Sequence, residues 1–222
     1  MKYLNMILVL LLSFFNLFSS NPSDLEKVGN TICLMGVNLI GENLSGKNFY
    51  RCVLYRAYLS NTIWYKAVLD HVEFEKANLT KSNLIGARFK KTTFLKAALR
   101  EAKLYETDLN DSNFTGANLE EADLHGSDLR KANFTGAKLK YAKLHDVKIE
   151  GAIVTGSDFE GVYGLTNEQK QYLRDNDAIN VPEDVEYDIE EYEEEIPEQN
   201  KLGWWAFMKW CINYFKSRKV KV

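Results

Sequence analysis

Residues 117–136 read ANLEEADLHGSDLRKANFTG, a stretch in which Leu or Phe returns at every fifth position. Large apolar residues keep this spacing without a break from Leu39 to Phe159, for 25 consecutive positions. A period of five fits neither the 3.6-residue period of an α-helix nor the two-residue alternation of a strand. The sequence therefore predicts a chain that turns a corner at every fifth position.

Small residues accompany the large ones. From Cys52 onward, the position two before each large residue carries mostly Ala, Ser or Thr, and only Glu42 and Lys47 near the start break the rule outright. We expect both members of each pair to point inward. The first must be small because two large side chains could not share one corner of a narrow, close-packed core.

Turn-forming residues fall at matching positions. Asn or Asp often directly precedes the large residue, and Gly often stands two positions after it, as at Gly116, Gly126 and Gly136. These residue types are the ones that favour tight turns. The pattern therefore predicts a turn after each large residue.

The units 117–121, 122–126 and 132–136, which read ANLEE, ADLHG and ANFTG, resemble the A(D/N)LXX consensus of the pentapeptide-repeat family. The likeness extends over the whole range 37–165. It implies an all-β solenoid, namely a right-handed quadrilateral β-helix with four pentapeptides per coil. We expect about six coils, with short helical additions at the N- and C-terminal ends.

Four pentapeptides per coil would stack residues that lie 20 apart. One column would then gather four phenylalanines, in the order Leu54, Phe74, Phe94, Phe114, Phe134 and Val154. Like side chains are expected to pack on like between coils stacked at the ~4.8 Å strand spacing. This sorting supports the four-sided interpretation independently of the resemblance.

The same spacing predicts ladders on the surface. One alternates in charge and the other consists of threonines: Arg100, Glu120, Lys140 and Glu160 in the first, and Thr115, Thr135 and Thr155 in the second. Exposed ion pairs contribute at most ~1 kcal/mol each, and three threonine rungs are too few to indicate a template for a partner. We interpret both ladders as ordinary solvated surface.

A third ladder would bring together Tyr105, His125 and His145, with Asp146 beside them. A metal site needs three or four converging ligands, so we predict neither a metal site nor a cofactor. Phosphate-binding glycine loops and the GxSxG and HExxH motifs are missing from the sequence. A solenoid of regular ladders also lacks the deep pocket that enzymes generally use, so the sequence predicts no enzymatic activity and no catalytic residues.

Residues 1–20 are typical of a signal peptide or a signal anchor. A single basic residue, Lys2, precedes an apolar run from Tyr3 to Phe18, and small polar residues follow. Because Leu17 or Phe18 stands where signal cleavage requires a small residue, both alternatives stay open. We expect a bacterial protein that is exported or membrane-anchored, on the periplasmic or extracellular side.

Five further segments follow. We expect an N-terminal cap over 21–36, the β-helix over 37–165, and a capping helix over 166–180 that opens with a capping box of Thr166 and Gln169. Within the predicted linker 181–200, the stretch 183–198 holds ten acidic residues and no basic one, which predicts disorder.

The last segment, 201–222, is predicted to be an amphipathic helix. Its apolar stretch, residues 202–215, is too short to span a bilayer, but its aromatic residues and basic tail suit the headgroup interface. The residues expected at a membrane interface are Trp204, Trp205, Phe207, Lys209, Trp210, Tyr214 and Lys216. A helix that docks on protein through the same aromatic face is the alternative.

Charge and cysteine content constrain the function. The chain has a net charge of −3, but residues 36–165 hold 18 Lys/Arg against 16 Asp/Glu. The three cysteines, Cys33, Cys52 and Cys211, are scattered and odd in number, which predicts structural thiols rather than a disulfide framework.

Some family members protect DNA gyrase with an acidic rod that resembles DNA, so the resemblance implies inhibition by polymer mimicry as one function. Such mimicry needs a strongly negative face, which this charge balance does not provide. We therefore expect a non-enzymatic scaffold or protein-interaction module, exported or tethered at a membrane, with the mimic as the alternative. The expected partners are an unidentified protein and a membrane surface rather than nucleic acid, and a homodimer stays open.

Overall fold

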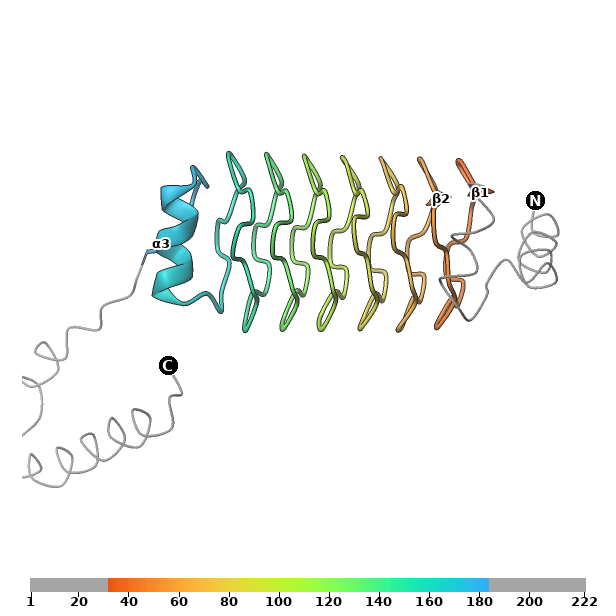
Figure 1. The fold of residues 1–222 in the computed structure, drawn as a ribbon, viewed down its shortest axis with the longest axis horizontal. Coiled ribbons are helices and arrows are strands. Elements are labelled where there is room, and N and C mark those ends of the chain that lie inside the picture. Colours follow the sequence, from red (N-terminus) through yellow and green to blue (C-terminus); the bar gives the residue numbers. More distant parts are fainter. Residues whose placement is uncertain (1–31, 184–222) are drawn as a thin grey trace, which may run out of the picture. The chain divides into compact units, whose positions relative to one another are not determined.

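The computed structural model describes residues 32–183, which form a stack of coils closed at one end by a helix (Figure 1). The strands β1 (Ile32–Cys33) and β2 (Cys52–Val53) pair in parallel in neighbouring coils. The helix α3 (Asn167–Asp175) crosses the other end of the stack. Isolated parallel bridges and turns build the remaining coils.

The bridges join positions that lie 20 apart. Asn38 pairs with Tyr58, Tyr58 pairs with Asn78, and the same step continues through the stack. Because each pentapeptide turns one corner, four successive pentapeptides close one four-sided coil. This closure agrees with the quadrilateral β-helix expected from the sequence.

A tight turn forms each corner. The Glu42 N–H donates to the Leu39 carbonyl at 3.0 Å, and this i to i+3 hydrogen bond recurs along the chain. The third residue of the turn has a positive φ at all 26 corners from Gly36 to Gly161, as a type II turn requires. Gly occupies ten of these positions, and the other sixteen carry a side chain.

The Asn and Asp residues that precede the large residues stabilise the corners from outside. Asn118 Oδ1 accepts a hydrogen bond from the Glu120 N–H at 2.9 Å. Asn133 Oδ1 accepts one from the Thr135 N–H at the same distance. These Asx turns explain why Asn and Asp recur at this position.

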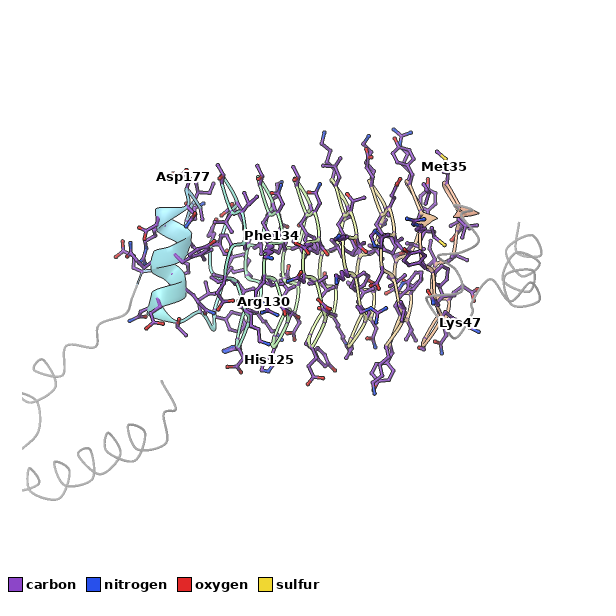
Figure 2. All side chains as sticks on the ribbon, in the orientation of Figure 1. Met35, Lys47, His125, Arg130, Phe134 and Asp177 are labelled. Atoms are coloured by element: carbon purple, nitrogen blue, oxygen red, sulfur yellow. The ribbon has the colours of Figure 1, made fainter. Side chains whose placement is uncertain are left out.

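The core is a narrow apolar column. The large residue of each unit and the small residue two before it are both buried from Cys52 onward, whereas Glu42 and Lys47 are half-buried. The predicted aromatic column is confirmed, with centroids 5.1, 4.6 and 5.0 Å apart between successive rings in the order Phe74, Phe94, Phe114 and Phe134. Its rings are within 7° of parallel, and Figure 2 shows Phe134 inside the stack.

Buried hydroxyl groups replace some of the core alanines. Ser112 Oγ donates to the Phe89 carbonyl at 2.7 Å. Ser127 Oγ donates to the Leu104 carbonyl at 2.6 Å. Ser82 differs, because its Oγ is buried and has no hydrogen-bond partner within residues 32–183.

The coil ends at Gly164, which has a φ of +93°. A Cβ on this residue would lie 2.6 Å from the backbone nitrogen of His145, so the chain can leave the coil here only through glycine. Next, Thr166 Oγ1 accepts the Gln169 N–H at 3.2 Å, and Gln169 Oε1 accepts the Thr166 N–H at 3.0 Å. This reciprocal capping box begins α3.

Side chains of α3 replace backbone donors at the end of the stack. Within the stack, the carbonyl two before each large residue accepts a backbone N–H from the next coil. The Val147 carbonyl instead accepts from Gln169 Nε2 at 2.8 Å, and the Ala152 carbonyl accepts from Tyr172 Oη at 2.9 Å. The edge that could pair with another chain is therefore partly satisfied from within.

Candidate interaction surface

The geometry of the coil decides which residues reach the surface. Each unit presents one outward residue on a flat side and two at the corner that follows, so the corners form four ridges along the stack. We call these ridges edges and name each one after its first turn residue, which gives the Met35, Ile40, Ser45 and Tyr50 edges. Every coil contributes one corner to each edge. Figure 2 shows Met35 and His125, a member of the Ser45 edge, at opposite margins of the stack.

The charged ladder forms only in part. Lys140 pairs with Glu160 on the next coil, as the spacing predicts, and this hydrogen bond is the main cause of the raised pKa of Lys140. Arg100 does not pair with Glu120 but binds Glu121 diagonally at 2.6 Å. The prediction for this rung was therefore wrong, because the long guanidinium side chain reaches across to the neighbouring position.

The histidine ladder brings its residues near one another without forming a ligand cluster. The ring centroids of His125 and His145 are 6.0 Å apart, and His125 Nε2 lies 3.9 Å from Asp146 Oδ2. The His145 ring instead contacts Tyr163 edge-on at 5.4 Å. Residues 32–183 contain no group of three or more His, Cys, Asp or Glu side chains arranged to hold a metal ion.

The threonine ladder is engaged in its own turns. Thr115 Oγ1 donates to Asn113 Oδ1 at 2.6 Å, and Thr135 Oγ1 donates to Asn133 Oδ1 at 2.7 Å. Since two of the three hydroxyl protons are used locally, this ladder is not a regular array of free donors.

One ion pair, between buried Asp70 and exposed Arg88, was not expected from the sequence. Asp70 accepts hydrogen bonds from Arg88 Nε at 2.8 Å and lies 2.7 Å from Arg88 Nη2, and it also accepts the Lys90 N–H at 3.1 Å. The Asp70 carboxylate raises the pKa of the Arg88 guanidinium. The two positions do not match the step that relates stacked coils, so a search for rungs at the coil spacing misses this contact.

The charges are separated along the stack, which the overall balance conceals. Residues 34–100 hold eleven Lys/Arg against four Asp/Glu, an excess of seven positive charges. Residues 101–165 hold seven Lys/Arg against twelve Asp/Glu, an excess of five negative charges. Counting by halves would have found this signal in the sequence.

The left-handed corner position carries much of this separation. Between residues 51 and 96, seven of the ten corner positions with positive φ are Lys or Arg, namely Arg51, Arg56, Lys66, Lys76, Lys81, Lys91 and Lys96. All seven are exposed. Gly or Asn would occupy the same backbone conformation with less strain, so cations stand where the fold itself does not favour them.

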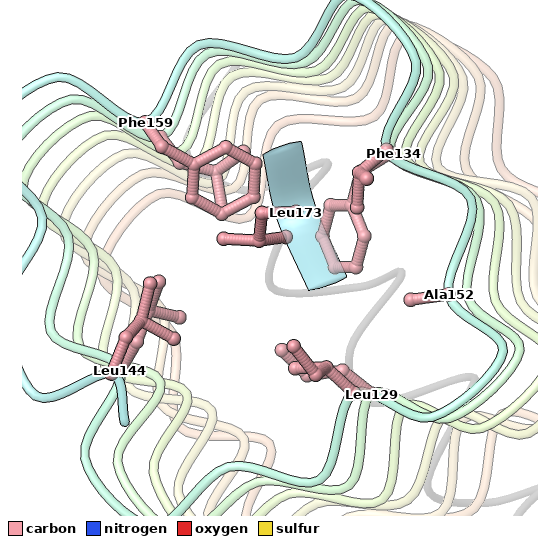
Figure 3. A pocket seen from close by; sticks show the side chains of 10 residues that line it. Leu129, Phe134, Leu144, Ala152, Phe159 and Leu173 are labelled. Carbon is pink, nitrogen blue, oxygen red and sulfur yellow. The ribbon is translucent and has the colours of Figure 1, made fainter. Parts of the chain in front are cut away.

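The cavity beneath α3 offers no place for a ligand. Figure 3 shows Leu173 of α3 above a ring of side chains that includes Phe134, Leu144 and Phe159. All its lining residues are apolar, and the enclosed volume is about 10 Å³, no more than a single water requires. This space is a packing defect under the cap.

Several predicted features lie outside the described residues. They are the signal segment 1–20, most of the acidic linker, Cys211 and the membrane-interface set Trp204, Trp205, Phe207, Lys209, Trp210, Tyr214 and Lys216. Cys52 is buried. Within residues 32–183, no helix has both the length and the apolar character needed to cross a membrane.

These features define a β-solenoid protein with regular surface ridges and a capped end. The model of the pentapeptide-repeat family matches the chain with eight copies over residues 32–63, 65–95, 94–130 and 117–156. The chain belongs to the pentapeptide-repeat family, as the A(D/N)LXX units predict. No curated protein sequence matches it.

Several solved structures of pentapeptide-repeat proteins are similar. One is HetL from the cyanobacterium Nostoc, involved in regulating heterocyst differentiation, with 21% identity over 62% of this chain and 76% of that chain and a TM-score of 0.33. Another is Rfr23 from the cyanobacterium Cyanothece, with 25% identity, 59% and 89% coverage and a TM-score of 0.39. QnrB1, a plasmid-mediated fluoroquinolone resistance protein, has 21% identity, 71% and 84% coverage and a TM-score of 0.33.

Proposed function

We propose that this protein is a non-enzymatic scaffold, a rod of about six coils with helical additions at its ends that is exported or held at a membrane and presents its ridges to a protein partner. The single observation that carries the proposal is the uninterrupted ladder of solvent-facing corners, which in residues 32–183 surrounds an apolar core whose space under α3 is only about 10 Å³. A rigid surface of this kind positions binding groups but offers no water-excluding site for chemistry.

The charge layout favours this proposal over polymer mimicry. A DNA mimic needs negative charge along the length of the rod, because its target surface is built for phosphates. The half nearest the N-terminus carries an excess of seven positive charges. Such a half would repel a nucleic-acid-binding surface.

Membrane fractionation of the expressed protein tests the tether. Full-length protein is compared with variants that lack residues 1–20, residues 202–222 or both. We expect release into the soluble fraction only when both segments are removed, because each is proposed to hold the rod independently. Full release of the protein by one single deletion would mean that the deleted segment alone is the tether. Retention of the double-deletion variant in the membrane fraction would contradict a tether by the ends.

A further inference from the structure

The Met35 edge changes character halfway along the stack. Over its first four coils it combines the apolar turn residues Met35, Tyr55 and Leu95 with the cations Arg56, Lys76 and Lys96, and its one acidic member, Glu75, lies 3.1 Å from Lys76 Nζ. From Thr115 onward the same edge reads only Thr followed by Gly, three times over. Both halves make the same turns with the same bridges, so the fold does not require this difference.

Aromatic and cationic groups are in contact on this edge. The Arg56 guanidinium lies 5.2 Å from the centroid of the Tyr55 ring, and Lys76 Nζ lies 5.3 Å from it. Lys76 Nζ also donates to Tyr55 Oη at 3.3 Å. Two cations from successive coils, Arg56 and Lys76, thus lie near the Tyr55 ring.

A second row of cations runs parallel to the first. The neighbouring Tyr50 edge contributes the exposed cations Arg51, Lys90 and Lys91, while its middle coil carries Asp70 and His71. On the flat side between the two edges, only Val53, Glu73 and Thr93 face outward in this range. Coils repeat at the ~4.8 Å strand spacing, so six cations border a nearly flat strip, which Asp70, Glu73 and Glu75 interrupt in its middle coil.

We propose that this side of the rod, between the Tyr50 and Met35 edges over residues 50–96, lies on a surface of anionic lipid headgroups. The inference rests on the proposed function, in which the ends hold the rod at a membrane. Cations with interleaved Tyr, Leu and Met are the composition that binds an anionic lipid interface, where apolar groups enter the headgroup layer and ammonium groups reach the phosphates. The strip also begins close in sequence to the predicted membrane segment that ends at Phe18.

The composition favours lipid over a soluble polyanion. Phosphate chains are held by cations and by stacking on open aromatic faces, whereas the Tyr55 ring is occupied by the protein's own cations. Met35, which lies on the same edge one coil before the strip and is exposed over 62% of its surface, adds nothing to phosphate binding but suits the acyl boundary.

The test compares two charge-reversal variants of the full-length protein. The test variant, Lys76→Glu/Lys96→Glu, alters the Met35 edge. The control variant, Lys66→Glu/Lys81→Glu, alters the same turn position in the same half of the stack, but on the Ser45 and Ile40 edges. All four lysines are exposed with positive φ, so the variants match in charge, residue type and backbone. Circular dichroism melting first establishes that both variants fold as the parent does.

Binding is measured by co-sedimentation at limiting lipid, with vesicles of phosphatidylcholine alone and with vesicles that contain phosphatidylglycerol. Binding to the neutral vesicles reports on the terminal segments and hence on the proposed tether. The anionic excess, which is the additional binding to phosphatidylglycerol-containing vesicles, reports on the strip. This excess should fall as the salt concentration rises. Each cation near an anionic surface strengthens binding roughly five-fold, so Lys76→Glu/Lys96→Glu should reduce the excess by at least about twenty-fold.

The control variant should reduce the excess by no more than about three-fold, which is the effect of net charge acting at a distance. Equal losses in both variants, or no excess binding of the parent protein to anionic vesicles, would overturn the proposal. Failure of neutral-vesicle binding with a preserved anionic excess would contradict the tether by the ends and leave the strip supported.

Discussion

At the scale of single residues, Ser82 is the clearest departure from the consensus of the core. Its hydroxyl is buried with no partner among the described residues, in a position where Ala is the commonest residue. A buried unsatisfied hydroxyl costs ~1 kcal/mol or more. We predict that Ser82→Ala raises the free energy of unfolding by about 1 kcal/mol, measured by urea denaturation.

Ser127→Ala is the matched control for this change. Its hydroxyl donates to the Leu104 carbonyl and lies 3.0 Å from Thr107 Oγ1. Removal of satisfied hydrogen bonds should lower the free energy of unfolding by about 1 kcal/mol. A destabilised Ser82→Ala variant would mean that the hydroxyl has a partner after all.

At the scale of elements, α3 closes the stack. Leu173 is its buried residue and covers the last apolar layer, while the opposite face of the helix is in solvent. We predict that Leu173→Ala costs about 2–5 kcal/mol in thermal or urea unfolding. It should also promote end-to-end association visible by light scattering, because the uncovered coil can pair with another chain.

The exposed face of the same helix provides the comparison. Gln171 is exposed and bonds only within the helix, to Asp175 at 2.7 Å. Gln171→Ala should change the free energy of unfolding by less than about 0.5 kcal/mol. Equal effects of the two substitutions would argue against α3 as a cap.

The segment that follows α3 is hydrogen-bonded to the carboxylate of Asp158. Asp158 accepts from Asn180 Nδ2 at 2.9 Å, and Ile179 pairs with Asp158 in a parallel bridge. Burial alone would raise the pKa of Asp158, but hydrogen bonds from Asn180 and the Glu160 N–H, together with Lys140, lower it below its ordinary value. The folded protein therefore binds a proton at this site less readily than the unfolded chain.

A lowered pKa in the folded state sets the sign of the pH dependence. The contribution of Asp158 to stability is complete above the ordinary pKa and is lost as the pH falls below it. We predict that the melting temperature drops between about pH 5 and about pH 3 and that Asp158→Asn makes this drop shallower while it lowers the melting temperature at neutral pH. If the variant showed the same drop in melting temperature at low pH as the parent protein, Asp158 would not be the cause of that drop.

At the scale of the whole described unit, the sequence predicts backbone features better than surface contacts. The phenylalanine column and the Asx turns follow directly from the repeat period and the coil spacing, because the bridges fix each core position. Arg100 and Arg88 could not be placed in this way, since their long side chains reach partners that do not lie at the coil spacing. Such choices depend on rotamers and local packing, which no periodicity encodes.

The ridges were harder to interpret than the core for a different reason. The lysines and arginines at the corners were visible in the sequence, but their meaning depends on the left-handed backbone that the structure assigns to them. The membrane-interface residues Trp204 and Trp210 lie outside the described residues and stay a prediction.

The constant bridge step from coil to coil also makes the chain a ruler. Because position in the sequence translates directly into height along the axis, duplication of one whole coil would lengthen the unit by ~4.8 Å and leave every downstream ridge in line with its upstream counterpart. An insertion of a single pentapeptide would instead rotate everything beyond it by a quarter turn and divide each ridge in two. Tandem growth in whole coils is therefore the one route by which such a protein can change its reach without changing which surface it presents.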